Sequence, residues 1–466
     1  MMTNTAVYHY FRVVIQANTP HGIHQDHGDV THDVLLLRDV NNLPAIPATS
    51  LAGVLRHLYM DTYGLTETEH LFGYADGEDG AISALSISWA LVNDSDNNAI
   101  EGIRSDVTSD ALLHFLARDK PIVRQRVRLN SQGCTDDNGK FDITLIPAGT
   151  RYTFFVGYWS DGSNEQEARI HQALSLLQSP AFRLGHGTRS GYGSFGLCSI
   201  EGAHWDLRTR EGQKGYSERP RKRAEVGNLK PISIEALQDT VLSVDINIKA
   251  ESGWRIGGGE QSLGASSEQE KAPDLLPQSE ILICWSGQQK ATLSHRQAVI
   301  PASAVKGALS HRVAFHYRRL SGEFAEQGVS SGHTECDAVS TLFGSANSDI
   351  EVQGAAGLVI IDDVYIEAPK VTSQMHNRID MFTGGVINGA LFEEELLWQT
   401  PLSLKLTILN QDKVSTLARK ALLLSLDDLT QGWLPLGAGG SRGHGCFLGA
   451  TQWSNNAWSD EQVESL

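Results

Sequence analysis

Residues 46–56 read IPATSLAGVLR, and residues 300–310 read IPASAVKGALS. The two copies lie 254 residues apart (300 minus 46), about half of a chain of 466 residues. In each copy a proline ends an extended segment, a small hydroxyl residue that can cap a helix follows, and apolar residues then recur at helical spacing. Each copy therefore predicts a capped helix, from about Thr49 to Tyr63 in the first, and the amides of its first turn form an anion site.

Other motifs repeat in the same order in the two halves. They are the Leu-Phe-Gly motif at 71–73 and 342–344, the segments RQRVR at 124–128 and HNRID at 376–380, and the glycine-rich loops at 184–193 and 436–445. The arginines of the two loops lie 253 residues apart (442 minus 189). A set of motifs in one order and at one offset predicts two copies of a domain of roughly 200–250 residues.

The composition between the two copies indicates a junction. Residues 204–235 are rich in Lys and Arg and contain few apolar residues. A run of charge is usually a solvated connection, although this one could also lie along a polyanion. We therefore predict a first domain at 1–203, a basic linker at 204–235 and a second domain at 236–466.

The composition also excludes several classes of protein. Hydrophobic residues make up 41% of the chain and charged residues 20%, which are values of a globular protein. No stretch approaches the ~20 apolar residues of a membrane span. The five cysteines are scattered without a Cys-x-x-Cys pair, so we expect a reduced, cytoplasmic protein rather than a zinc ribbon or a disulfide framework. A net charge of −17 is unlike that of a free protein with broad nucleic-acid affinity, but leaves room for a local basic groove.

Local patterns predict an α+β fold. Residues 6–17 alternate β-branched and aromatic side chains and predict a first strand, and 165–178 predict an amphipathic helix. The glycine-rich loop at 184–193 allows positive φ angles, so its amides could cradle a phosphate with Arg189. It is not a Walker loop, because no Gly-Lys-Ser/Thr ends it.

Two polar segments have open interpretations. The loop at 18–33 carries four histidines and three aspartates, but a zinc site needs convergent ligands that a loop spacing does not fix, so solvated histidines are favoured. A single carboxylate that assists a weakly held Mg²⁺ needs less sequence support. In the predicted hairpin at 121–140, alternate arginines face one side. This side is either simply exposed to solvent or forms an arm that contacts phosphates.

Taken together, the capped helices, the Leu-Phe-Gly motifs, the HNRIDMFTGG segment at 376–385 and the two glycine-rich loops resemble the RAMP superfamily. The resemblance is specifically to the backbone subunits of type III CRISPR effector complexes, and it covers about 6–200 and 241–450. The resemblance implies two fused ferredoxin-like domains of the RNA-recognition type. It also implies an inserted β-hairpin in each domain, called a thumb, at 121–140 and at 370–392.

The resemblance further implies a function. Such subunits stack along a guide RNA, hold its backbone with the glycine-rich loop and the capped helix, and use the thumb to displace a base of the paired target. An aspartate before the capped helix then cleaves the target RNA. The expected partners are guide (CRISPR) RNA, target RNA and other subunits of the complex, with no membrane.

The family pattern before Ile-Pro places the catalytic residue of the first half at Asp33. The pattern consists of an aspartate, a short apolar strand, a basic residue and a second aspartate. In this sequence these parts are Asp33, residues 35–37, Arg38 and Asp39. RNA carries its own nucleophile, the 2′-hydroxyl. Asp33 could bind Mg²⁺, or another divalent cation, or could help to deprotonate that hydroxyl.

The second half departs from this pattern, because no aspartate stands at the equivalent distance before Ile300. The candidates in its longer loop are Asp274, Glu280 and Glu268, of which Asp274 is preferred as catalytic. This departure leaves open that the second half only binds RNA.

The resemblance assigns the RNA-binding residues in both halves. They are Thr49, Ser50, Arg56, Arg124, Arg126, Arg128, Gly187, Arg189 and Gly191 in the first, and Ser303, Lys306, Asn377, Arg378, Gly439, Arg442 and Gly443 in the second. Three alternatives remain: a guide-RNA processing nuclease that uses a histidine of the 21–32 loop, a non-catalytic RNA-binding scaffold, and a duplicated α+β protein unrelated to RNA.

Overall fold

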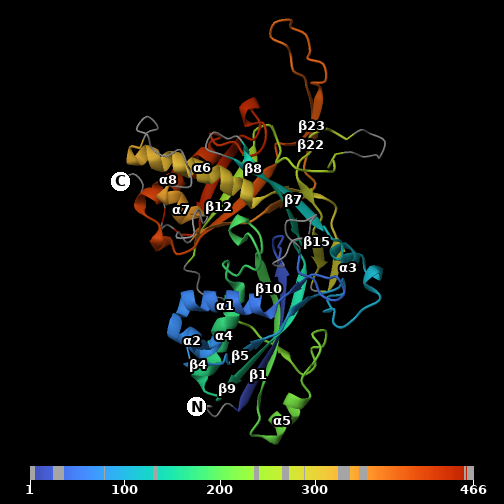
Figure 1. The fold of residues 1–466 in the computed structure, drawn as a ribbon, viewed down its shortest axis with the longest axis vertical. Helices are drawn as coiled ribbons and strands as arrows, with labels where there is room; N and C mark the ends of the chain where they lie inside the picture. Colours follow the sequence, from blue (N-terminus) through green and yellow to red (C-terminus); the bar gives the residue numbers. More distant parts are fainter. Residues whose placement is uncertain are drawn as a thin grey trace.

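Each half of the chain contains an antiparallel sheet with helices packed against it (Figure 1). The computed structural model describes residues 6–24, 36–77, 79–129, 135–235, 241–264, 272–287, 289–323, 336–345, 354–455 and 458. Within this part of the chain, no helix has both the length and the apolar character that crossing a membrane requires.

The first half has the strand order β11-β10-β1-β9-β6-β2, with β5 also paired to β9. Its sheet strands are β1 (Val7–Ala17), β2 (Ala45–Ile46), β5 (Leu85–Ile87), β6 (Ala90–Val92), β9 (Arg151–Ser160), β10 (Phe195–Asp206) and β11 (Lys230–Pro231). Its helices are α1 (Ala48–Tyr63), α2 (Leu65–Phe72), α3 (Ala111–Leu116), α4 (Asn164–Ser175) and α5 (Arg210–Ser217), and a small hairpin joins β3 (Tyr74–Asp76) to β4 (Asp79–Ala81). The chain order β1, α1, β6, β9, α4, β10 is consistent with a ferredoxin-like domain.

The second half repeats this arrangement with the order β20-β24-β12-β25. Its main elements are β12 (Leu242–Ala250), α6 (Ala302–Ser321), α7 (Asp337–Phe343), β20 (Val359–Ile361), β24 (Pro401–Ile408), α8 (Thr416–Thr430) and β25 (Phe447–Trp453). Its short strands are β13 (Gly253–Trp254), β14 (Ser279–Glu280), β15 (Ile283–Ser286), β16 (Lys290–Leu293), β17 (Gln297–Ile300), β18 (Gly344–Ser345), β19 (Ala355–Ala356) and β21 (Val364–Ile366). The mixed α+β architecture predicted from the sequence is confirmed in both halves.

Each half contains a long β-hairpin that overlaps the segment predicted from the sequence, 121–140 or 370–392, and extends beyond its end. The first pairs β7 (Ile122–Leu129) with β8 (Thr135–Leu145), and the second pairs β22 (Val371–His376) with β23 (Phe392–Trp398). The chain between β22 and β23 projects from the body, at the top of Figure 1.

Two clusters of buried hydrophobic side chains form the main cores, one in each half. The hairpin β15–β16 of the second half crosses this division, because Ile283 and Ala291 belong to the core of the first half. The indole N–H of Trp285 also donates to the carbonyl of Gly149 at 2.7 Å. The two halves are therefore packed against each other through this hairpin.

The basic segment at 204–235 is not simply a solvated connection. Strand β10 continues to Asp206, and the pair Lys230–Pro231 extends the first sheet beside β10. Arg223 forms an ion pair with Glu101, and its carbonyl accepts from Arg12. These contacts hold the segment 204–235 against the first half, because Arg223 pairs with a carboxylate and donates to a carbonyl of that half.

Candidate nucleic-acid interface

The two glycine-rich loops have the same backbone geometry. Each encloses a single 3-10 turn, Thr188–Ser190 in the first loop and Gly440–Arg442 in the second. The φ angles are 92, 67, 96 and 71° at Gly185, Gly187, Gly191 and Gly193, and 92, 79, 81 and 74° at Gly437, Gly439, Gly443 and Gly445. These pairs match at an offset of 252 (437 minus 185), so Arg189 and Arg442 stand one position apart in the loops rather than at equivalent positions.

The first loop lies directly against the start of α6 in the second half. A Cβ atom on Gly191 would come within 2.3 Å of the Cβ of Ala302, so only glycine fits there. The loop therefore brings residues of the first half to the N-terminus of a second-half helix.

Three cations meet at this junction: Arg126 from β7, Arg189 from the first loop and Lys306 from α6. Burial, and then the charges of Arg126 and Arg189, lower the pKa of Lys306 to about 8. Burial, and then the charge of Arg183, also lower the pKa of Arg189. No described carboxylate is among the groups that shift Lys306, and the buried Nε of Arg189 has no hydrogen-bond partner among the described residues. We call these three residues the junction cations.

A cleft of about 150 Å³ opens between the two halves beside the junction cations. Its lining includes Arg124, Arg126 and Tyr192 of the first half and Gln278 and Ser303 of the second. Convergent cations that form no ion pair with a described carboxylate suit a phosphate. The arrangement can hold a nucleic-acid backbone.

The predicted hydroxyl caps are wrong for both helices. Helices α1 and α6 begin at Ala48 and Ala302, with Pro47 and Pro301 as N-caps and no side-chain cap hydrogen bond. Helix α1 starts one residue earlier than predicted, and in both helices the hydroxyl residue, Thr49 or Ser303, falls inside the first turn. The amide of Ala302 instead donates to Oδ1 of Asp363 at 2.7 Å, so the first amide of α6 already has an internal anion.

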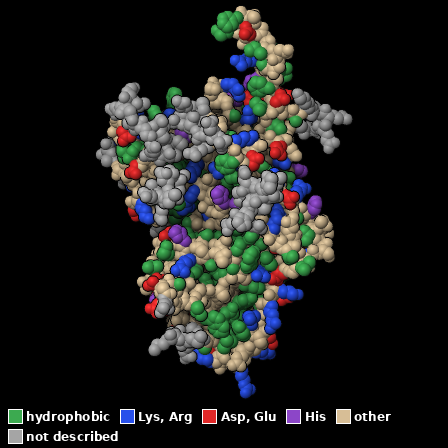
Figure 2. Space-filling view, viewed as in Figure 1, with side chains coloured by type: hydrophobic (Ala, Val, Ile, Leu, Met, Phe, Trp, Pro, Cys, Tyr) green, Lys and Arg blue, Asp and Glu red, His purple; other side chains and the backbone are tan. Residues whose placement is uncertain are grey.

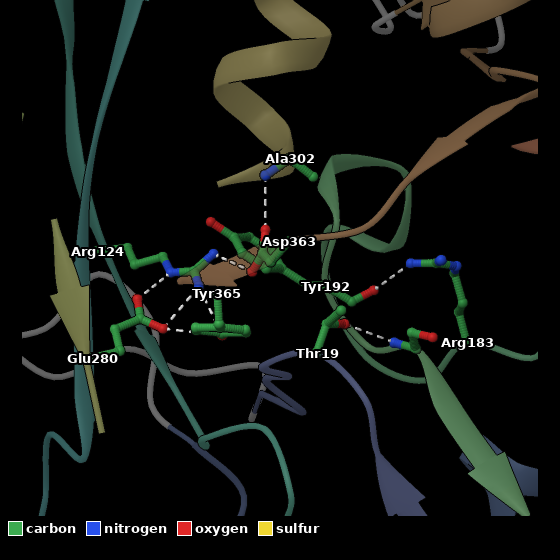
Figure 3. Close-up of polar contacts among 9 residues, drawn as sticks. Thr19, Arg124, Arg183, Tyr192, Glu280, Ala302, Asp363 and Tyr365 are labelled. Atoms are coloured by element: carbon green, nitrogen blue, oxygen red, sulfur yellow. Dashed lines mark hydrogen bonds and ion pairs between the residues drawn. The ribbon is translucent and has the colours of Figure 1, made fainter. Parts of the chain in front are cut away.

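Arg124, which the sequence predicted to bind RNA, is buried and paired with two carboxylates. Its side chain is 2% exposed, and its Nε lies 2.5 Å from Oε1 of Glu280 and its Nη1 lies 2.6 Å from Oδ2 of Asp363 (Figure 3). The hydroxyl of Tyr365 donates to Glu280 at 3.2 Å. Arg124 is therefore a buried link between the halves, and its partner Glu280 is not available as a catalytic acid. Arg183 forms a second ion pair across the junction, with Asp362.

The arginine of the second glycine-rich loop forms an ion pair, whereas Arg189 of the first forms none with the described carboxylates and is only influenced by the charge of Asp61. Glu394 on β23 is buried and lies 3.1 Å from Nε of Arg255, 2.7 Å from Nε2 of His376 and 3.6 Å from Nη2 of Arg442. Burial alone would raise the pKa of Glu394, but the hydrogen bond from Arg255 and the charges of Arg442 and His376 lower it. Arg442 is thus partly neutralised, although its side chain is 45% exposed.

The remaining predicted RNA-binding residues lie apart from the junction cleft. Thr49 and Arg56 are exposed and Ser50 is half-buried on α1, while Asn377 and Arg378 are exposed beyond the end of β22. The strand β7 includes Arg128, whose side chain is outside the described residues. Of the predicted set, the structure brings together Arg126, Arg189, Gly191, Ser303 and Lys306.

The predicted catalytic acids are only partly described. Asp33 and Glu268 lie outside the described residues. Asp274 is exposed at the base of the β22–β23 hairpin, where its Oδ2 accepts from the amide of Glu393 at 3.0 Å. The sequence did not reveal Asp362, Asp363 and Glu394 as ion-pair partners of arginines. The one local sign of these acids was that each ends or interrupts an apolar strand.

Comparison with known proteins identifies the family. The model of the RAMP superfamily matches residues 14–196 and 247–447, so the chain belongs to this superfamily and contains two RAMP regions. One similar solved structure is described as "Cryo-EM structure of the Type III-B Cmr-beta bound to cognate target RNA", with 16% identity and a TM-score of 0.29. The match covers 42% of this chain and 60% of that one. The search of curated proteins finds no match.

Proposed function

We propose that the protein is a guide-RNA-binding backbone subunit of a type III CRISPR ribonucleoprotein that cleaves complementary target RNA with the help of a divalent cation. The observation that carries this proposal is the set of junction cations, which come from both halves and form no ion pair with a carboxylate among the described residues, although the charge of Asp61 acts on Arg189. Such a site suits the phosphates of a strand that runs across both RAMP regions.

Backbone contacts explain how a guide of any sequence is held. Arg126, Arg189 and Lys306 neutralise phosphates, which supplies affinity without reading bases. Ser303 lies in the cleft at the start of α6, where its hydroxyl can reach a phosphate oxygen. Gly191 allows the first glycine-rich loop to approach α6 closely. A bound RNA strand can therefore pass from the first half to the second along a continuous surface.

The two inserted hairpins are suited to separate guide from target at intervals, as thumbs. The tip of the β22–β23 hairpin presents Met381 and Phe382, which are 86% and 89% exposed. Figure 2 shows this tip standing clear of the body with hydrophobic side chains on it. Exposed apolar side chains on a projecting hairpin can enter between base steps and unstack them.

Cleavage is assigned to Asp33 in the first half and Asp274 in the second. A carboxylate fits Mg²⁺, which prefers oxygen ligands, and Asp274 offers one at the base of the projecting hairpin. A bound divalent cation would stabilise charge that develops on the phosphate. A displaced base frees the ribose so that its 2′-hydroxyl can align with the phosphorus, and the aspartate can take the proton of that hydroxyl.

The test is cleavage of an end-labelled target by the assembled complex. Asp33→Asn and Asp274→Asn should each remove one specific cut and leave target binding unchanged, and EDTA should remove both cuts. Asp412→Asn, an exposed aspartate elsewhere, is the matched control and should retain every cut. The catalytic proposal is wrong if the double variant still makes every cut at the wild-type rate. That result with intact RNA binding would establish the scaffold instead.

One observation supports a processing nuclease as the second candidate. His24 has a buried Nε2 without a described hydrogen-bond partner, and its ring centroid lies 5.7 Å from that of His186 in the first glycine-rich loop. His21 does not fit this role, because it is buried and its Nε2 lies 2.8 Å from the hydroxyl of Tyr152. Metal-independent cleavage of repeat RNA by the isolated chain, lost in His24→Ala, would favour this function.

A further inference from the structure

A separate group of metal-ligand side chains lies in the first half. It consists of His9 on β1, Glu167 on α4 and His204 on β10, and one ligand atom from each lies within 4.8 Å of the others. The site is distant from the junction, since the strand β1 rises by roughly 26 Å between His9 and its end at Ala17. None of these three residues takes part in the proposed RNA interface.

The fold brings the ligands together by regular strand pairing. His9 and His204 are direct cross-strand partners of neighbouring strands, so they point to the same face of the sheet, with ring centroids 5.6 Å apart. Helix α4 is capped by Ser163, whose hydroxyl accepts from the amide of Gln166. The cap fixes the first turn, which carries Glu167, on the same face as the two histidines.

His9 is also oriented for binding. Its Nε2 lies 2.8 Å from the hydroxyl oxygen of Ser160, which is fully buried and also accepts from the amide of Gly162. In the tautomer that donates from Nε2 to Ser160, Nδ1 carries the lone pair that a metal requires. Burial, and then the charge of His204, lower the pKa of His9 to about 4, so the ring stays neutral at neutral pH.

We propose that His9, His204 and Glu167 bind one transition-metal ion of borderline character, such as Zn²⁺. Two imidazoles and one carboxylate are a ligand set for Zn²⁺ and neighbouring metals, whereas Mg²⁺ prefers oxygen ligands alone. This ion is therefore distinct from the one proposed for RNA cleavage. Because it joins β1, β10 and α4, it would stabilise the first half, and the exposed side of His204 leaves a position for water or a further ligand.

The test is titration of the untagged, chelator-treated full chain with Zn²⁺ in a calorimeter. We expect one ion per chain, and His204→Ala and Glu167→Gln should each weaken binding by at least about 10-fold. Ser160→Ala should weaken it by about 10-fold, because the serine orients His9 without touching the ion. His295→Ala, an exposed histidine on the second half, should bind as the wild type does.

Two further measurements separate binding from folding. Co²⁺ should give a visible absorption band with the wild type and none with His204→Ala. Circular dichroism should show that His204→Ala and Glu167→Gln remain folded. Zn²⁺ at one concentration should raise the melting temperature of the wild type by more than that of Glu167→Gln, because the variant binds the ion more weakly. The proposal is overturned if the wild type binds no Zn²⁺, or if His204→Ala and Glu167→Gln bind it as tightly as the wild type.

Discussion

We predict that Lys306 makes RNA binding sensitive to pH in a range where lysines usually do not titrate. In the free protein its pKa is about 8, because it is buried and lies beside Arg126 and Arg189. A phosphate bound among the three cations favours the charged amine, so the pKa of Lys306 rises in the complex. Binding at a pH above 8 must therefore take up a proton.

The size of the effect follows from the two protonation states. With a pKa of about 8, the free protein carries charged Lys306 in about nine-tenths of molecules at pH 7 and in about one-tenth at pH 9. The complex keeps it charged at both values. The affinity should therefore fall about 10-fold between pH 7 and pH 9, and this loss is linked to a single proton.

Fluorescence anisotropy with a short labelled single-stranded RNA, at constant ionic strength, measures this dependence. Lys306→Arg is the matched control, because it keeps a charge that does not titrate in this range. It should bind with an affinity that is nearly independent of pH. Lys306→Met should bind more weakly at pH 7, with a salt slope lower by about 0.7, and should also lose the pH dependence.

Two results would refute the reasoning. A wild-type affinity that is constant from pH 7 to pH 9 would show that Lys306 does not face the bound phosphate. An equal fall in wild type and Lys306→Arg would assign the pH dependence to another group.

Other predictions concern the buried link, the loop arginines and the projecting hairpin. Arg124→Met should lower the free energy of unfolding by about 3–5 kcal/mol in urea titrations, because it leaves two buried carboxylates without their cation; weaker RNA binding at unchanged stability would contradict the buried role. Arg189→Ala should reduce the slope of log affinity against log salt concentration by about 0.7. Arg442→Ala should reduce it by less, because Glu394 already offsets the charge of Arg442. An equal reduction in both variants would be inconsistent with that ion pair. Replacing 378–390 by Gly-Gly should change the free energy of unfolding by less than about 0.5 kcal/mol, because the tip is exposed, and should abolish or shift one cut; an unaltered set of cuts would exclude a thumb role.

The duplicated architecture could be predicted because its signals are local. These signals depend only on neighbours in the sequence. They are a proline before a helix, glycines at positions of positive φ, and the alternation of apolar and polar side chains along a strand. The two glycine-rich loops were recognisable for this reason, and their φ angles agree pair by pair. The one-residue displacement of Arg442 relative to Arg189 is already present in the sequence, because the glycines of the two loops align at an offset of 252 and the arginines at 253.

The partners of the arginines could not be predicted, because they come from remote segments. Arg124 looked like its neighbour Arg126, yet its partner Glu280 is 156 residues away. Only the packing of the two halves buries one arginine and leaves the other beside the cleft. Packing within the second half places Asp363 at the start of α6, where the sequence indicated a hydroxyl cap. The role of Asp33 remains a prediction, since it lies outside the described residues.

The central claim is that one RNA strand crosses the junction of the two RAMP regions. Ultraviolet cross-linking of the purified ribonucleoprotein, followed by mass spectrometry of the peptides, tests it most directly. We predict a short RNA of uniform length, with adducts concentrated in peptides that contain residues 125–127, 188–192 and 303–306, and fewer adducts in Lys306→Met. Absence of co-purified RNA, or adducts confined to segments away from the junction, would contradict the account.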